Sequence, residues 1–126
     1  MKGGAIVGLD HVQLAMPAGK EDEARKFYVT LLGFTEQPKP VSLAVRGGLW
    51  LRAGTCELHL GVDPDFHAAA KAHPGFVVEN LNALAERLRQ AGCELRSDAL
   101  IAGRRRLFTT DPFGNRIELI EFQETT

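Results

Sequence analysis

The sequence lacks a dominant charge, a long apolar run and a set of cysteines. Its 126 residues include 15 lysines and arginines against 16 aspartates and glutamates, a formal net charge of -1. Such a balance creates no broad field of one sign that would attract nucleic acid or an anionic membrane. No stretch approaches the roughly 20 apolar residues of a membrane-spanning helix, and the first residues lack the pattern of a signal peptide. We therefore expect a cytoplasmic protein whose partners are small molecules or its own copies.

Cysteine is scarce, with only Cys56 and Cys93 in the chain. One pair cannot make the disulfide framework of a small secreted protein, and the wide spacing does not suit a zinc or redox motif. We expect two packed free thiols. Hydrophobic residues are plentiful at 44%, which is enough for one core in a chain too short for two independent domains. The prediction is a single domain over residues 1–126.

The first half of the chain has the pattern of a strand, a helix and then two or three strands. Residues 9–16 alternate polar and apolar side chains before Pro17, which predicts a strand with His11 and Gln13 on the face away from the core. An acidic stretch followed by an apolar stripe at helical spacing predicts an amphipathic helix that ends at Gly33. Further short strands are predicted at residues 41–45, 49–52 and 56–60.

The same order of elements restarts after a linker. Residues 73–78 predict a strand, and Asn80 is suited to cap a helix that ends at Gly92. The last strands are predicted at residues 94–96, 104–110 and 115–122.

Equivalent landmarks in the two halves keep a nearly constant spacing. The offset in numbering is 73 − 11 = 62 from His11 to His73, 92 − 33 = 59 from Gly33 to Gly92, and 118 − 57 = 61 from Glu57 to Glu118. We interpret this as an internal duplication, with module 1 at about residues 6–62 and module 2 at about residues 73–123.

Each module alone would expose the apolar face of its helix and the edges of its sheet. We therefore expect an α+β fold in which two strand-helix-strand modules pack around a pseudo-two-fold axis and form one curled mixed sheet around a cleft. Equivalent side chains would converge on this cleft, His11 with His73 and Glu57 with Glu118.

Histidine and glutamate side chains make the candidate site. Alternation along the last strand of each module points Glu57, His59 and Glu118 into the cleft. Imidazole and carboxylate donors suit a divalent Zn, Ni, Mn, Co or Fe ion, whereas imidazole disfavours calcium. We expect a metal held by His11, His73 and Glu118, with Glu57 and His59 competing for the fourth position. The alternative is that each of these residues is structural, in a turn, a loop or a solvated strand.

Three motifs carry a family resemblance that covers nearly the whole chain. They are Leu-Asp-His-Val at residues 9–12, the end of the first helix at residues 27–34, and Asp-Pro-Phe-Gly-Asn-Arg-Ile-Glu-Leu at residues 111–119, which is the most specific. The chain resembles the vicinal oxygen chelate superfamily, which includes glyoxalase I, fosfomycin and bleomycin resistance proteins and extradiol dioxygenases. The resemblance implies paired βαβββ modules, a homodimer, metal ligands at His11, His73 and Glu118, and a fourth glyoxalase-like ligand at Glu57.

The resemblance also implies a class of activity. Open positions on a divalent metal (Zn, Ni, Mn or Fe) would chelate a small oxygen-rich substrate, as in a glyoxalase-like lyase or isomerase, and Glu118 or Glu57 would move a proton. In a dioxygenase-like case, two histidines and one glutamate would hold Fe(II). The alternative from another class is a metal-free protein of the bleomycin resistance type, which binds and sequesters a small molecule or antibiotic.

Five further residues are candidate substrate contacts: Gln13, Trp50, Arg104, Arg106 and Phe108. Phe108 stands where the fosfomycin-thiol transferases that the chain resembles carry a tyrosine, and Gln13 stands near where they carry a threonine, which argues against fosfomycin chemistry. Arg104 and Arg106 share the face of Phe108 and could bind a carboxylate or phosphate, or belong to a solvated loop. Trp50 could line the cleft or join the core.

Overall fold

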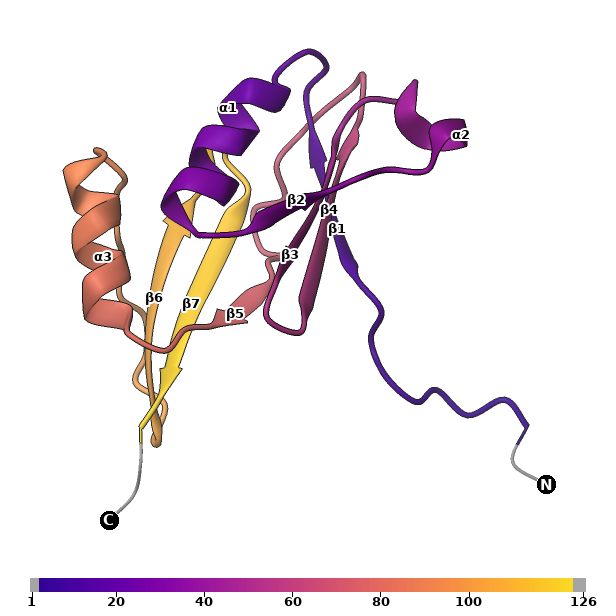
Figure 1. The fold of residues 1–126 in the computed structure, drawn as a ribbon. Coiled ribbons are helices and arrows are strands. Elements are labelled where there is room, and N and C mark those ends of the chain that lie inside the picture. Colours follow the sequence, from indigo (N-terminus) through magenta and orange to yellow (C-terminus); the bar gives the residue numbers. More distant parts are fainter. Residues whose placement is uncertain (1–2, 124–126) are drawn as a thin grey trace.

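The computed structural model describes residues 3–123 (Figure 1). The first module contains β1 (Val12–Met16), α1 (Glu21–Arg25), the π-helix η1 (Lys26–Leu31), β2 (Thr35–Gln37), α2 (Val41–Ala44), β3 (Leu49–Ala53) and β4 (Cys56–Val62). The second contains β5 (Gly75–Val77), α3 (Leu81–Gln90), β6 (Arg104–Thr110) and β7 (Arg116–Phe122). The predicted α+β class with two related modules is confirmed.

Each module builds a small mixed sheet in which its first strand pairs in parallel with its last strand. The order is β1-β4-β3-β2 in the first module and β5-β7-β6 in the second. The strand predicted at residues 94–96 forms only an isolated bridge, from Arg96 to Phe108 beside β6. This bridge stands where β2 stands in the first module, so both modules repeat one arrangement.

The predicted helices form, and their ends have the expected causes. The first begins as α1 and continues into η1, and its stripe of Ala24, Phe27 and Tyr28 is buried. It ends at Gly33, whose φ of 85° is the left-handed conformation that glycine adopts at helix ends. Asn80 caps α3, because its side chain accepts a hydrogen bond from the backbone N–H of Ala83 at 3.0 Å. None of the helices within residues 3–123 is long and apolar enough to span a membrane.

The prediction of a strand at residues 41–45 is wrong, because this segment forms the short helix α2. Val41 and Val45 are almost fully exposed, so the apolar residues that suggested a strand do not face a core. The chain then turns sharply at Gly48, whose φ is 83°. A side chain there would collide with the carbonyl oxygen of Leu60 on β4, so only glycine lets the turn approach the sheet.

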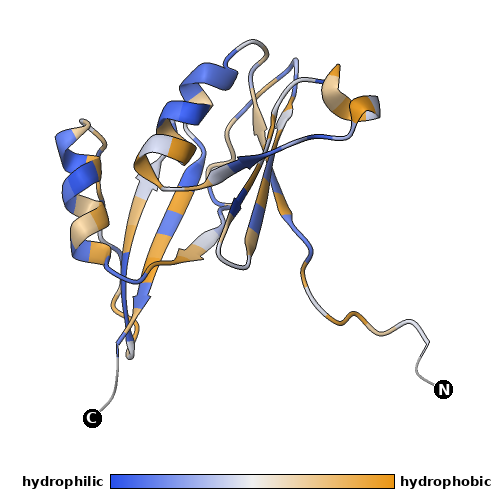
Figure 2. Ribbon diagram, in the orientation of Figure 1, coloured by the Kyte–Doolittle hydropathy of each residue, from blue (hydrophilic) through white to orange (hydrophobic). Residues whose placement is uncertain are grey.

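A single apolar core joins the two modules. The rings of Phe34 and Phe76, one from each module, meet edge to face with centroids 5.4 Å apart. Figure 2 shows hydrophobic and hydrophilic residues alternating along the strands, as expected for sheets with one face on a core. The helices α1, η1 and α3 lie on this inner side, where Arg87 of α3 donates a hydrogen bond to the carbonyl of Leu31 in η1 at 2.9 Å.

Buried polar contacts also connect the modules. The Tyr28 hydroxyl on η1 donates to the Asp111 carboxylate at 2.7 Å, and the Asn115 side chain donates to the carbonyl of Ala15 on β1 at 2.8 Å. Asp111 also accepts hydrogen bonds from the backbone N–H groups of Phe113 and Asn115. The Asp-Pro-Phe-Gly-Asn motif therefore both shapes the turn before β7 and fastens the second module to the first.

Candidate functional site

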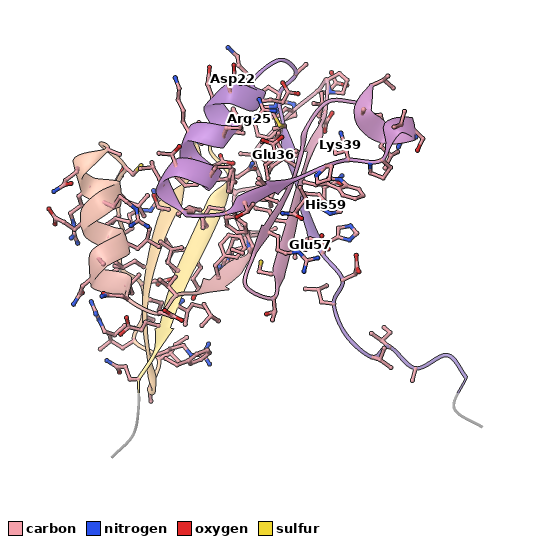
Figure 3. All side chains as sticks on the ribbon, viewed as in Figure 1. Asp22, Arg25, Glu36, Lys39, Glu57 and His59 are labelled. Carbon is pink, nitrogen blue, oxygen red and sulfur yellow. The ribbon has the colours of Figure 1, made fainter. Side chains whose placement is uncertain are left out.

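The candidate residues form two groups on the outer faces of the two sheets. On β4, Leu58 and Leu60 point into the shared core, so His59 points outward; on β7 the buried Leu119 likewise leaves Glu118 facing outward. Figure 3 shows Glu57 and His59 projecting from the first module on the side away from α1. Within residues 3–123, no three His, Cys, Asp or Glu side chains lie close enough together to hold one metal ion. Among these residues the structure brings His11 and His59 together, and His73 and Glu118 together, but it does not bring all four into one group.

The first group contains a stack of three rings. The His59 ring lies between His11, at a centroid distance of 4.1 Å, and Trp50, at 4.2 Å. His59 is 6% exposed, and its Nε2 atom is buried with no hydrogen-bond partner among the described residues. Burial lowers the pKa of His59 below its usual 6.5, and the neighbouring His11 lowers it further. The ring is therefore neutral at pH 7, the form in which histidine binds metals.

His11 is oriented by its neighbour. Its Nδ1 atom lies 2.7 Å from a carboxylate oxygen of Asp10, and the hydrogen bond from His11 lowers the pKa of Asp10. Because a carboxylate accepts, Nδ1 is the donor in this contact, and Nε2 is the ring nitrogen that remains to face a ligand. A carboxylate behind a histidine in this way is common around metal sites.

A pocket of about 520 Å³ surrounds this group and contains further polar side chains. Glu57 lines it and forms an ion pair with Arg52 at 3.3 Å. Gln13 also lines it and lies across Gly61, where an added Cβ would be 2.6 Å from the Gln13 Nε2 atom. A larger cavity of about 750 Å³ lies elsewhere, between the hairpin around Gly54 and α3, and none of the candidate residues lines it.

The second group is centred on Glu118. Its Oε1 atom lies 2.8 Å from Nε2 of His73, and its Oε2 atom accepts a hydrogen bond from Nη1 of Arg106 at 3.1 Å. Burial tends to raise the pKa of Glu118, but the hydrogen bonds from His73 and Arg106 outweigh it, so the pKa is lowered and the group is ionised at neutral pH. Nδ1 of His73 faces the carbonyl oxygen of Lys71 at 2.9 Å.

Two of the predicted substrate contacts belong to this second group and one does not. Arg106 donates one hydrogen bond to Glu118 through Nη1 and another to the carbonyl of Ala99 through Nη2. Phe108 is buried beside the His73 ring, with centroids 5.1 Å apart. Arg104 instead lies over the ring of Phe122 near the end of β7.

Strand pairing corrects the alignment of the two modules. Gln13 and Gly75 each follow the histidine of their module, His11 or His73, by two positions in the sequence. In the first sheet, Gln13 pairs with His59, which pairs with Trp50 on the next strand. In the second sheet, Gly75 pairs with Glu118, which pairs with Phe108 on the next strand. The counterpart of Glu118 is therefore His59, whereas the spacing of the landmarks along the sequence had pointed to Glu57.

The model of the Glyoxalase/Bleomycin resistance protein/Dioxygenase superfamily matches residues 8–119. The chain belongs to this superfamily. The resemblance noted from the sequence motifs is thereby confirmed. A comparison with functionally curated proteins finds no match.

Several solved structures share the fold of this chain. A glyoxalase family protein from Bacillus anthracis is similar over 97% of this chain and 100% of its own, at 42% identity and a TM-score of 0.91. The fosfomycin resistance protein FosX from Listeria monocytogenes has the same fold at 13% identity, with 97% and 96% of the two chains covered and a TM-score of 0.73. TnmS3, an antibiotic binding protein from Streptomyces, has it at 21% identity, with 95% and 99% covered and a TM-score of 0.71.

Several residues around the site of this glyoxalase-superfamily chain were not predicted from the sequence. Lys39 and Arg46 line the pocket of the first group, and they were overlooked because the segment between them was predicted to be a strand. Asp10 stands next to a candidate ligand in the sequence, and that adjacency was a usable signal. The carbonyl of Lys71, which contacts His73, is a backbone group, so the pattern of side chains could not predict it.

Proposed function

We propose that the chain is a glyoxalase-like enzyme of the lyase or isomerase type, which binds a small oxygen-rich substrate on a divalent metal held between two copies of the chain. The observation that carries the proposal is the pair formed by His73 and Glu118, whose facing nitrogen and oxygen atoms lie 2.8 Å apart. Two acceptor atoms do not approach each other so closely unless a proton or a metal cation lies between them.

The hydrogen bonds of His73 define that requirement. The carbonyl of Lys71 can only accept, so Nδ1 of His73 carries a proton. The ionised Glu118 can also only accept. Either a proton on Nε2 of His73 or a metal ion must therefore lie between the two atoms, which are 2.8 Å apart. Donor atoms that share one such ion, each about 2.1 Å from it, lie about 3.0 Å apart at an octahedral angle and about 3.4 Å apart at a tetrahedral one, so this pair would open only slightly to hold a metal. The two residues therefore fit as ligands of one ion, with the proton and the metal competing for the same place.

The first group supplies matching donors. Nε2 of His59 is buried without a partner, and Nε2 of His11 is left free by the contact between Nδ1 and Asp10. A buried nitrogen without a partner is costly, and a bound metal removes that cost. A set of three imidazoles and one carboxylate suits Zn, Ni, Mn or Fe.

A second copy of the chain is needed because one chain separates the two groups. The outer edges of β1 and β5 pair with no other strand among the described residues, and unpaired edges are normally covered. The segment that leads into β1 exposes Ile6 at 94% and Val7 at 98%. A two-fold dimer that sets the first module against the partner's second module would cover these features and complete two equal sites.

The chemistry divides between the metal and the protein. A divalent ion bound there would polarise the substrate oxygens and stabilise the negative charge that develops on them. Glu57 lines the same pocket as His11 and His59, and its carboxylate would accept a proton from the carbon next to the substrate carbonyl. Arg106 would keep the Glu118 carboxylate in place through its second oxygen.

One observation favours a second candidate function, metal-free binding of a small molecule or antibiotic. The ion pair of Arg106 with Glu118 at 3.1 Å is largely buried and balances the carboxylate charge without a metal. The fold shared with the antibiotic binding protein TnmS3 is compatible with this alternative.

Metal content separates the two functions. Elemental analysis of dialysed protein is expected to give about one ion per chain, as in a dimer with two equal sites, and little metal in His73→Ala. His67→Ala is the matched control, because His67 is exposed in the linker and outside both groups. The enzyme activity is tested by metal-dependent deuterium exchange into hydroxyacetone, followed by NMR. A protein that stays free of metal after reconstitution, or a His73→Ala variant that binds as much as His67→Ala, would instead support the binding function.

A further inference from the structure

Two cations, Lys39 and Arg46, line the pocket in the first module. Lys39 precedes α2, and Arg46 follows it, so the short helix carries both to the rim of the pocket that His11, His59 and Trp50 line. Figure 3 shows Lys39 on the same side of the module as His59. The positive charge of Lys39 is close enough to the His59 ring to contribute to the lowering of its pKa, so Lys39 belongs to the same site.

The carboxylates around this pocket are already engaged. Glu57 pairs with Arg52 at 3.3 Å, and Asp10 pairs with His11 at 2.7 Å. Glu21, at the start of α1, accepts the backbone N–H of Gly48 at 2.9 Å.

The cations themselves have no such partner. Lys39 donates to the carbonyl oxygen of Gly47, which satisfies only one of its N–H groups. Across residues 3–123, no carboxylate lies within ion-pair distance of either Lys39 or Arg46. The pocket therefore contains uncompensated donors as well as the buried His59 nitrogen that lacks a partner.

We infer that Lys39 and Arg46 bind an oxyanion group of the substrate, a carboxylate or a phosphate-type group, and so select anionic substrates. The inference rests on the proposed function for the position of the substrate's other end, near His11 and His59. A guanidinium can bind an oxyanion with two parallel hydrogen bonds and an ammonium binds it as a point charge, so the two together are suited to such a group. The pocket volume of about 520 Å³ accommodates a small molecule.

The test uses the fluorescence of Trp50, the only tryptophan of the chain, which lines the pocket. Malonate and inorganic phosphate are titrated separately into metal-free protein, with neutral malonamide as the comparison. We expect saturable binding of at least one anion and none of malonamide. The double variant Lys39→Met/Arg46→Met is expected to weaken anion binding about tenfold or more. Arg105→Met, an exposed arginine in the second module, is expected to leave the affinity unchanged.

The outcome is independent of whether the chain binds metal. Anion binding that depends on Lys39 and Arg46 in a protein without metal would support this inference while the proposed enzyme function fails. Normal metal content with no saturable anion binding, or with equal affinity in the double variant, would overturn the inference and leave the metal centre intact. Circular dichroism of each variant establishes that the protein is folded.

Discussion

His59 stands in the first module where Glu118 stands in the second. Both lie on the last strand of their module, and an aromatic residue pairs with each from the neighbouring strand, Trp50 with His59 and Phe108 with Glu118. The duplicated fold thus offers a nitrogen donor at one position and an oxygen donor at the equivalent one. We therefore propose His59, rather than Glu57, as the fourth ligand of the metal centre.

Substitution of His59 and of Glu57, one at a time, distinguishes a metal ligand from a proton acceptor. His59→Ala removes a donor and is expected to weaken metal binding tenfold or more, whereas Glu57→Gln is expected to keep the metal and lose deuterium exchange into hydroxyacetone. Competition with a chromophoric chelator gives the affinities. Stronger metal loss in Glu57→Gln than in His59→Ala would reverse the assignment.

The hydrogen bond from Tyr28 to Asp111 is expected to contribute to the stability of the whole chain because it connects the modules. Tyr28→Phe removes a donor from a buried carboxylate, and we expect the free energy of unfolding to fall by about 1.5–3 kcal/mol. Urea denaturation measures this change. A loss below a few tenths of a kcal/mol would mean that the remaining donors to Asp111 suffice.

The same tyrosine predicts a pH dependence. Burial, with the nearby charge of Asp111, raises the pKa of Tyr28 well above 10.0. Above about pH 10, the unfolded chain loses this proton while the folded chain keeps it, so the free energy of unfolding falls as the pH rises. Tyr28→Phe lacks this contribution. The difference in stability between wild type and variant is therefore expected to shrink from about pH 8 to about pH 11, and a constant difference would contradict the shift.

Arg106 is expected to stabilise the metal-free protein by balancing the charge of Glu118, which a bound metal would also balance. Arg106→Met leaves the Glu118 charge uncompensated, so the melting temperature of metal-free protein should fall, and a divalent ion should restore more stability than it adds to the wild type. Thermal melts with and without zinc measure both changes. An equal zinc-induced shift in the two proteins would show that Arg106 and the metal do not act on the same carboxylate.

The apolar segment before β1 is expected to hold the dimer together. Ile6→Ser with Val7→Ser removes apolar surface that a partner would bury, so the dimer dissociation constant should rise about tenfold or more. Val41→Ser is the control, since Val41 is also almost fully exposed in a single chain but belongs to α2. Analytical ultracentrifugation separates the outcomes. A monomeric wild type, or an equal effect of Val41→Ser, would refute the role of this segment.

Much of the fold could be predicted because the spacing of apolar residues agreed with the glycine and asparagine residues that mark the ends of the helices. The helix that ends at Gly33 and the helix capped by Asn80 both formed where the sequence placed them, and β6 matched its predicted bounds. The segment that became α2 was misread because Val41 and Val45 are apolar without being buried. The last strand of each module was predicted. Which residue of one last strand corresponds to which residue of the other depends on the pairing across each sheet. The spacing of the landmarks along the sequence varies, so it could not show that His59 corresponds to Glu118.

The arrangement of the site was harder to predict than its residues. Strand alternation pointed His59 and Glu118 out of the core correctly, yet the duplication alone suggested that both modules face one cleft. The decisive information is tertiary: the shared core and the contact of Tyr28 with Asp111 place the apolar faces of the two modules together, so the polar faces are directed outward.

Mixed dimers test the proposed intersubunit metal centre most directly. Chains with His11→Ala and His59→Ala are coexpressed with chains carrying His73→Ala and Glu118→Ala, and the mixed dimer is isolated through two different tags. In a site shared between copies, one of the two sites in each mixed dimer is intact, so the metal content should be about half that of the wild type, while each variant alone binds none. A mixed dimer that is as free of metal as its parents would contradict the account.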